Sequence, residues 1–325
     1  MIESGSMGLP TGGAHQRTLT EVALDILRKG PGERITTSLQ LQERLDVGSG
    51  TVQKALRQLV DAGAVRLRVK GHQGTVIQRY DPALLWRAAD LGSLRLTLTP
   101  PGSIESTALA TEIRAQLAAH HVTTEFDFVR GGGRRIATLA DTQPRVAALS
   151  RVAAEGFGLI DDVDYSVLDL GTLTYYRPET LVVLRSPSVP ADQVRRVARD
   201  RESYDHEQLT LLEFPPSAGF EYIDCAFPDV PASILSGRAD AGVWHQVATV
   251  ISPEQAGLEV APVHWDEAAL GSEVISHAVL VWRSEFIEID ALLGLLDPAT
   301  IRAKQQRLVA LGIGSAEVRE TIPWL

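Results

Sequence analysis

Residues 47–77, VGSGTVQKALRQLVDAGAVRLRVKGHQGTVI, begin with a helical pattern of apolar residues. These residues repeat at helical spacing, at Val52, Ala55, Leu56 and Leu59. We expect Ser49 to cap this helix at its start and Gly63 to end it in the left-handed conformation.

The second half of the same stretch has the alternation of a β-hairpin. The side chains predicted to face inward are Val65, Leu67 and Val69, and those predicted to face outward are Arg66, Arg68 and Lys70. The glycines of GHQG then turn the chain into a second strand at residues 75–77.

Two helices are predicted before this stretch. Thr18 and Glu21 have the spacing of a capping box, so we expect a first helix that starts there and runs to about Lys29, before GPG. A second, short helix is expected from Thr37 or Ser38 to Leu45. Three helices followed by a basic hairpin predict a winged helix-turn-helix.

The charge of the chain is divided unevenly along its length. Residues 17–80 hold 11 Lys and Arg against 6 Asp and Glu, whereas residues 81–325 hold 20 against 34. Because surface charges beyond about 8 Å are screened at physiological ionic strength, a basic block can bind an anionic partner on a chain of net charge −10.

The outward face of the predicted third helix carries Gln53, Lys54 and Arg57, side chains that reach base edges in a major groove. Arg68 and Lys70 of the hairpin suit phosphate contacts. The candidate DNA contacts are Thr37, Ser38, Ser49, Thr51, Gln53, Lys54, Arg57, Arg68, Lys70 and His72. The alternative is a solvated helix face, or a winged helix that docks on another protein.

Four short stretches of this block, PGERI, GTVQKALRQL, AGAV and GHQGT, resemble the GntR-type winged helix of bacterial transcription regulators. GTVQKAL and KGHQGT are more similar to the YhfZ-like group. That resemblance implies a C-terminal part related to type II periplasmic binding proteins and to LysR effector domains.

The rest of the chain alternates strands and helices, which predicts α/β sheets covered by helices. We expect a disordered leader at residues 1–16, the winged helix at 17–80, a linker at 81–93 and a two-lobed α/β domain at 94–325. GRADAGVW, residues 237–244, is similar to the phrase that ends the second lobe of type II binding proteins. The helices expected near residues 287–296 and 298–311 would close the first lobe.

Ligands of open α/β sheets bind beyond the carboxyl ends of strands, so the residues after the predicted strands are candidates for an effector site. Ser103 and Ser150 can cap helices whose amides favour an anionic group, and RGGGRR is either a ligand loop or a mobile surface loop. The candidate residues are Ser103, Glu105, Gly131, Gly132, Arg134, Ser150, Arg151, Tyr175 and Trp244.

Other site chemistry finds little support in the sequence. Lys304 is the only lysine after residue 80 and lies in a polar stretch, which disfavours a pyridoxal phosphate site. Cys225 is the single cysteine, and no histidine spacing suggests a metal site, so we expect no cofactor and no metal. No apolar run is long enough to cross a membrane and no signal-peptide pattern is present, so we expect a cytoplasmic protein.

These patterns together predict a ligand-responsive bacterial transcription regulator that is not an enzyme. Its expected partners are a double-stranded DNA operator, a small-molecule effector with an anionic or polyhydroxy character, and a second copy of the chain. The alternatives are a cryptic enzyme with a hydrolase-like cleft fused to a winged helix, and a scaffold whose winged helix docks on proteins.

Overall fold

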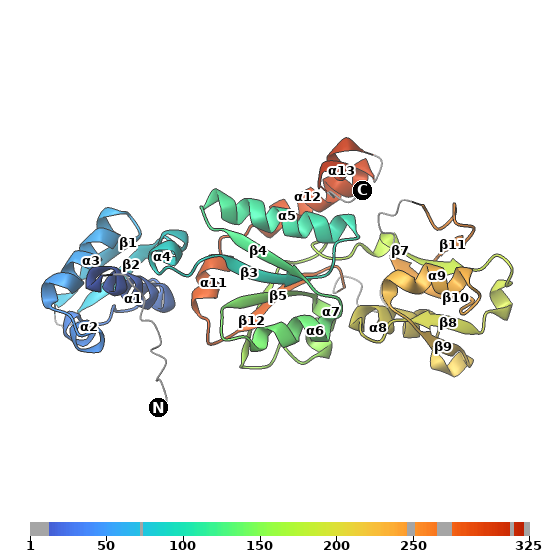
Figure 1. Cartoon of the computed structure of the whole chain (residues 1–325), viewed down its shortest axis with the longest axis horizontal. Helices are drawn as coiled ribbons and strands as arrows, with labels where there is room; N and C mark the ends of the chain where they lie inside the picture. The colour runs from blue at the N-terminus through green and yellow to red at the C-terminus, as the bar shows by residue number, and fades with distance from the viewer. Residues whose placement is uncertain (1–12, 72–73, 246–250, 265–274, 313–314, 322–325) are drawn as a thin grey trace, which may run out of the picture. The chain divides into compact units, whose positions relative to one another are not determined.

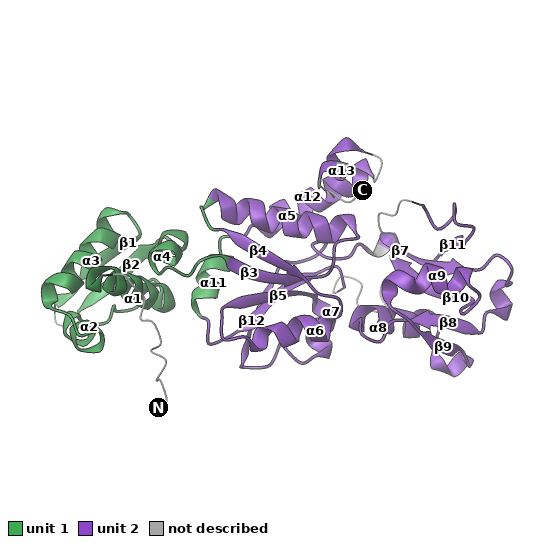
Figure 2. Cartoon of the chain, in the orientation of Figure 1, with its two compact units in different colours: residues 1–93, 120–122, 287–295 green, residues 94–119, 123–286, 296–325 purple. Residues whose placement is uncertain are grey.

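The computed structural model describes residues 13–71, 74–245, 251–264, 275–312 and 315–321. The chain divides into two compact units (Figure 2). Unit 1 comprises residues 1–93, 120–122 and 287–295, and unit 2 comprises residues 94–119, 123–286 and 296–325.

Unit 1 contains the predicted winged helix (Figure 1). Its elements are α1 (Ala14–Lys29), α2 (Ser38–Leu45), α3 (Ser49–Asp61), β1 (Val65–Val69) and β2 (Thr75–Tyr80). The apolar stripe of α3 is buried at Val52, Ala55 and Leu59, and β1 pairs with β2 in an antiparallel hairpin. Gly63 has the expected positive φ of 74° after α3.

Three local predictions in this unit are wrong. Helix α1 starts at Ala14, so residues 14–16 of the expected leader are helical; residues 1–12 lie outside the described part. Thr18 is not a cap, because its buried hydroxyl donates to the Ala14 carbonyl inside the helix. Gly48, not Ser49, is the N-cap of α3, and no side chain caps that helix.

The inward face of the hairpin is shorter than predicted. Val65 is buried, but Val69 is 76% exposed, since β1 extends past the apolar core toward the hairpin tip. The side chain of Val69 is therefore part of the wing surface.

Two further helices complete unit 1. Helix α4 (Pro82–Ala88) lies where a linker was expected; Asp81 caps it and it buries Leu85 and Trp86. Helix α11 (Glu288–Leu293) packs against α1 and α4 and buries Ile289, Leu292 and Leu293. The prediction that the helix near residues 287–296 closes the first lobe is wrong, because its apolar face belongs to unit 1.

The first lobe of unit 2 is a five-stranded sheet in the order β4-β3-β5-β12-β6. Its strands are β3 (Leu94–Leu98), β4 (Thr124–Phe128), β5 (Arg145–Ser150), β6 (Tyr165–Asp169) and β12 (Ala278–Arg283). Strand β12 returns from the second lobe and pairs antiparallel with both β5 and β6. The helices of this part are α5 (Ile104–Ala119), α6 (Gly132–Ala137), α7 (Arg151–Gly156), α12 (Pro298–Leu311) and α13 (Ala316–Thr321).

The second lobe has a five-stranded sheet in the order β11-β7-β10-β8-β9. Its strands are β7 (Leu181–Arg185), β8 (Arg196–Arg199), β9 (Glu221–Asp224), β10 (Ala241–His245) and β11 (Glu259–Pro262), and its helices are α8 (Tyr204–Glu213) and α9 (Val230–Leu235). Two sheets joined by crossing segments confirm the predicted fold class, a winged helix-turn-helix followed by a two-lobed α/β domain.

Candidate functional site

The outward face of α3 is the first candidate site. Its stripe of buried apolar residues leaves Gln53, Lys54 and Arg57 exposed on the opposite side. Ser49 is exposed in the first turn and Thr51 is half-buried. In the described part of the chain, neither Lys54 nor Arg57 forms an ion pair, so both charges are available to a partner.

The start of α2 offers less to a partner than the sequence suggested. Thr37 caps the helix, and its hydroxyl and the side chain of Gln40 bond each other and the backbone in a capping box. Ser38 accepts hydrogen bonds from the Gln42 amide through its hydroxyl and its carbonyl oxygen. Both hydroxyls are engaged within the helix.

The two predicted cationic contacts of the wing, Arg68 and Lys70, are exposed, as are Arg66 and Arg79 of the same hairpin. The backbone of Lys70 closes the turn by donating to Gly74, which fixes the base of the tip. The candidate contact His72 lies outside the described residues.

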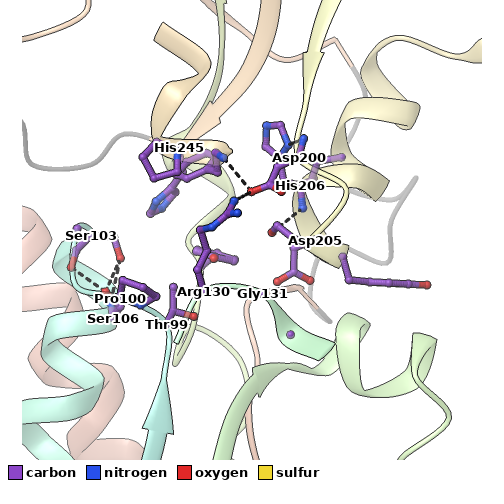
Figure 3. Close-up of a pocket in the computed structure, with 18 of the residues that line it drawn as sticks. Thr99, Pro100, Ser103, Ser106, Arg130, Gly131, Asp200, Asp205, His206 and His245 are labelled. Atoms are coloured by element: carbon purple, nitrogen blue, oxygen red, sulfur yellow. Dashed lines mark hydrogen bonds and ion pairs between the residues drawn. The ribbon is translucent and has the colours of Figure 1, made fainter. Parts of the chain in front are cut away.

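The second candidate site is a cavity of about 230 Å³ in unit 2, between its two lobes (Figure 3). The carboxyl ends of β3, β4 and β5 and the starts of their helices supply one wall, as expected for α/β sheets. The other wall comes from the segment around α8 and from the end of β10. Its lining includes Thr99, Pro100, Ser103, Ser106, Arg130, Gly131, Gly132, Tyr176, Asp200, Tyr204, Asp205, His206, Leu209, Phe227, Trp244 and His245.

The wall of the first lobe is shaped by a helix cap and a glycine. The Ser103 hydroxyl caps α5 by accepting from the Ser106 backbone N–H at 3.0 Å. Gly131 precedes α6 with φ of 87°, and a Cβ there would lie 2.8 Å from the Glu202 carbonyl oxygen. Only glycine therefore allows this close approach of the two lobes.

Arg130 is neutralised by two carboxylates of the second lobe. Its guanidinium bonds Asp200 at 2.6 Å and Glu202 at 2.7 Å, and Arg134 bonds the other oxygen of Glu202 at 2.8 Å. Asp200 also accepts from the Phe227 backbone N–H. These pairs join the lobes and leave little free charge at this end of the cavity.

Asp205 has a different environment. Its side chain is buried in the first turn of α8, and the Ser150 hydroxyl donates to its Oδ1 at 2.5 Å. Burial raises the pKa of Asp205 above its ordinary value, against the lowering effects of the Ser150 hydrogen bond and the positive charge of Arg135. The second carboxyl oxygen, Oδ2, accepts no hydrogen bond from the described residues.

Two histidines complete the lining. His206 accepts from the Asp200 backbone N–H and bonds the Val243 carbonyl at 3.0 Å, and burial lowers its pKa. His245 bonds Glu105 at 3.2 Å. Burial raises the pKa of Glu105, but the positive charge of a protonated His245 and its hydrogen bond outweigh this and bring the pKa below its ordinary value.

The structure brings four of the nine candidate effector residues to the cavity wall, namely Ser103, Gly131, Gly132 and Trp244. Glu105 lies behind His245, and Ser150 lies behind Asp205. Tyr175 is buried against Thr99 through a 2.8 Å hydrogen bond, and its neighbour Tyr176 lines the cavity instead.

Two of the candidate arginines lie outside the cavity. Arg134 is paired with Glu202, and Arg151 pairs with Glu155 and Asp169. The segment RGGGRR is not one loop, because residues 132–137 form α6; Arg130, Gly131, Gly132 and Arg135 of this segment line the cavity. Arg135 is buried there and donates to the carbonyls of Val129 and Ala148.

The sequence reasoning missed Asp205, His206 and Phe227. The signal for the first two was present, since they start the helix that follows the carboxyl end of β8. Phe227 stacks on Trp244 with ring centroids 4.4 Å apart, a contact that no local pattern predicts.

Within the described residues, no group of three or more His, Cys, Asp or Glu side chains is placed to hold a metal ion. None of the described helices is long and apolar enough to cross a membrane.

Residues 81–313 match the YhfZ C-terminal domain family, and residues 31–77 match a helix-turn-helix domain family. The chain is 27% identical over 293 residues to an Escherichia coli K12 protein described as "Uncharacterized protein YhfZ", a match that spans 90% of this chain and 94% of the relative. It is also similar to the crystal structure of YhfZ from Shigella flexneri, with 24% identity, a TM-score of 0.54, and coverage of 71% of this chain and 95% of that one. Similarity to the Escherichia coli aliphatic sulphonate binding protein SsuA is weaker, at 16% identity and a TM-score of 0.44 over 71% of this chain and 79% of that one.

Proposed function

The chain belongs to the YhfZ C-terminal domain family, and from this premise we propose that it is a ligand-responsive bacterial transcription regulator. In this proposal the winged helix of unit 1 binds operator DNA and the cavity of unit 2 binds a small effector. The observation that carries the proposal is the pair Lys54 and Arg57, exposed without an ion pair on the outward face of α3 in the described structure.

The proposed DNA contacts divide by chemistry. Gln53, Lys54 and Arg57 project from the helix that enters the major groove in winged helices, so we assign base contacts to them. Arg68 and Lys70 lie on the wing and are assigned to phosphates. We further propose that this winged helix is of the GntR type, on the motifs GTVQKALRQL and GHQGT.

A selection from random duplex DNA tests this assignment. The full chain should enrich a common sequence, and fluorescence anisotropy with that duplex should show a loss of roughly 5–150-fold for Lys54→Ala and for Arg57→Ala, corresponding to about 1–3 kcal/mol each. The matched control is Arg238→Ala, which removes an exposed arginine of unit 2. If both variants of α3 bound the selected duplex as tightly as Arg238→Ala, the proposed DNA-binding face would be wrong.

We propose that the regulator acts as a homodimer on an imperfect palindrome, because one small winged helix buries too little surface to select a site in a genome. Sedimentation at micromolar concentration, with and without the selected duplex, measures this. A monomer under both conditions contradicts it.

We propose that the effector acts by changing how the lobes of unit 2 close. The effector itself is bound and released without a chemical change. Arg130 with Asp200, and Ser150 with Asp205, are bonds between lobes that border the cavity, so a ligand there competes with or strengthens them. A coupling free energy of about 1–3 kcal/mol changes operator affinity about 5–150-fold.

Helix α11 supports a route from the cavity to the DNA-binding unit. Its chain leaves β12 of the first lobe, yet Glu288 pairs with Arg28 of α1, at 2.9 Å between Oε2 and Nε and 3.2 Å between Oε1 and Nη2. We propose that a shift of β12 reaches α11 through the four residues that join them, and that α11 passes it to α1, on which it packs.

A further inference from the structure

We propose that the cavity of unit 2 binds a small organic amine, whose ammonium group pairs with Oδ2 of Asp205 and whose apolar body contacts the surrounding rings. This inference rests on the proposed function, because it names the chemical class of the effector. The sequence predicted an effector with an anionic or polyhydroxy character, whereas this inference predicts a cationic group.

Asp205 stands apart from the other acids at the cavity. Only 6% of the residue is exposed, it forms no ion pair within the described structure, and its Oδ1 is already occupied by the Ser150 hydroxyl. Figure 3 shows the side chain extending from α8 toward Gly131 of the first lobe. Oδ2 thus has no partner among the described residues, and it belongs to a largely buried residue that lines the cavity.

A buried polar group without a partner is costly, and such groups are usually satisfied. Burial raises the pKa of the Asp205 carboxyl group by more than the Ser150 hydrogen bond and the Arg135 charge lower it, so its charged form is only partly compensated by the protein. A ligand ammonium at Oδ2 supplies both the missing hydrogen bond and the missing charge.

The cations at the cavity are already committed to protein acceptors. Arg130 is held by Asp200 and Glu202, and Arg135 donates to two backbone carbonyls. An entering carboxylate or phosphate would lie beside Asp205 and would find Arg130 already paired with two carboxylates. The Arg135 guanidinium also lines the cavity; within the described structure it donates to backbone carbonyls and forms no ion pair. The α5 N-terminus at Ser103 and the Arg135 guanidinium are the features of the described lining that favour an anion, so the test must include an anionic probe.

The remaining lining suits an apolar or aromatic body. Four aromatic residues, Tyr176, Tyr204, Phe227 and Trp244, line the cavity. The faces of such rings attract cations as well as apolar groups, so they favour an alkyl or aryl ammonium over a free inorganic cation. A cavity of about 230 Å³ suits a small metabolite.

Three probes of one skeleton test the charge that the cavity recognises: 2-phenylethylamine, 2-phenylethanol and phenylacetate. Ligand-observed NMR on the full chain at neutral pH, without DNA, measures their affinities. We expect saturable binding of the amine at millimolar concentration or below, at least tenfold tighter than the alcohol, and still weaker binding of phenylacetate. Equal or tighter binding of the alcohol or of phenylacetate, or no saturable binding of the amine, overturns the inference.

The variant Asp205→Asn tests whether the Asp205 carboxylate is the group that recognises the ammonium. The variant keeps the shape and the acceptor for Ser150 but loses the negative charge, so the preference for the amine over the alcohol should fall by at least tenfold. Glu207→Gln is the matched control, because Glu207 lies two residues away on α8, does not line the cavity and should leave the preference unchanged. An undiminished preference in Asp205→Asn would overturn the assignment.

Two features of this design keep its outcomes separate. The comparison of the three probes uses the unmodified chain, so it decides the ligand class even if Asp205→Asn proves unstable in a thermal melt. The measurement also contains no DNA. Failure of the amine to bind therefore contradicts this inference alone, whereas unchanged duplex affinity in the α3 variants contradicts the proposed function.

Discussion

Replacing Arg28 with alanine should destabilise unit 1 more than replacing its partner Glu288 with glutamine. The two side chains form a bidentate pair between α1 and α11, but their surroundings differ, since 45% of the Arg28 side chain is exposed and only 2% of that of Glu288. The Glu288 hydrogen bond is the main cause of a raised pKa at Arg28. Loss of the arginine leaves a buried carboxylate unpaired, whereas loss of the carboxylate charge leaves a guanidinium that water reaches.

The magnitude follows from this asymmetry. Breaking a fully buried ion pair costs about 3–5 kcal/mol, and the exposure of Arg28 reduces that, so we expect Arg28→Ala to cost about 2–3 kcal/mol. Glu288→Gln keeps the shape and one acceptor oxygen and should cost about 1 kcal/mol. The double variant should cost less than the sum of the two, by about 1–2 kcal/mol.

Hydrogen exchange read by mass spectrometry on peptides of α1 and α11 isolates the stability of unit 1 from that of unit 2. Peptides of the second lobe serve as the internal control and should exchange as in the unmodified chain. Equal costs for the two single variants, or a larger cost for Glu288→Gln, would refute the reasoning from burial.

Three further outcomes follow from the structure. Lys70→Ala should weaken binding to all duplexes alike and lower the slope of log affinity against log salt by about one, in an anisotropy titration at several salt concentrations. Burial raises the pKa of Asp240, but hydrogen bonds from the Arg196 and Arg195 backbones and from the Arg196 side chain bring it below its ordinary value. The charged Asp240 therefore stabilises the folded chain at pH values above its unfolded pKa of about 3.9, and this contribution is lost as the pH falls through the lower folded pKa. Urea titrations should show that Asp240→Asn costs about 1–2 kcal/mol at pH 7 and less at pH 3. Gly242→Ala would place a Cβ 2.9 Å from the Val230 side chain in the core of the second lobe, and a loss of about 1–3 kcal/mol should appear in thermal unfolding.

The winged helix could be predicted from sequence because its signals are local. The spacing of apolar residues on α3, the left-handed Gly63 and the alternation of the hairpin each act within a few residues. The structure confirms the first two and the antiparallel hairpin, but not the inward position of Val69. The errors at Thr18 and Ser49 concern single caps, where a glycine one or a few residues earlier starts the helix.

The cavity could be predicted only in part because its lining is not local. Ligands of α/β sheets bind beyond the carboxyl ends of the strands, and this rule predicted Ser103 and Gly131, which line the cavity. Asp205 depends on a hydrogen bond from Ser150, 55 residues away in the chain, and the stacking of Phe227 on Trp244 depends on how two segments pack. The spacing of apolar residues gives no information on such pairs.

Unit 1 cannot be completed in the order in which the chain is synthesised, because α11 is made long after the rest of the unit. The winged helix and α4 have been synthesised by residue 93, but α11, which packs on α1 and α4, is synthesised roughly 200 residues later. At a synthesis rate of about 5–20 residues per second, the apolar surface that contacts Ile289 and Leu292 stays uncovered for about 10–40 s. During that interval unit 1 lacks the Arg28–Glu288 pair, so unit 1 is complete only once most of unit 2 has been made.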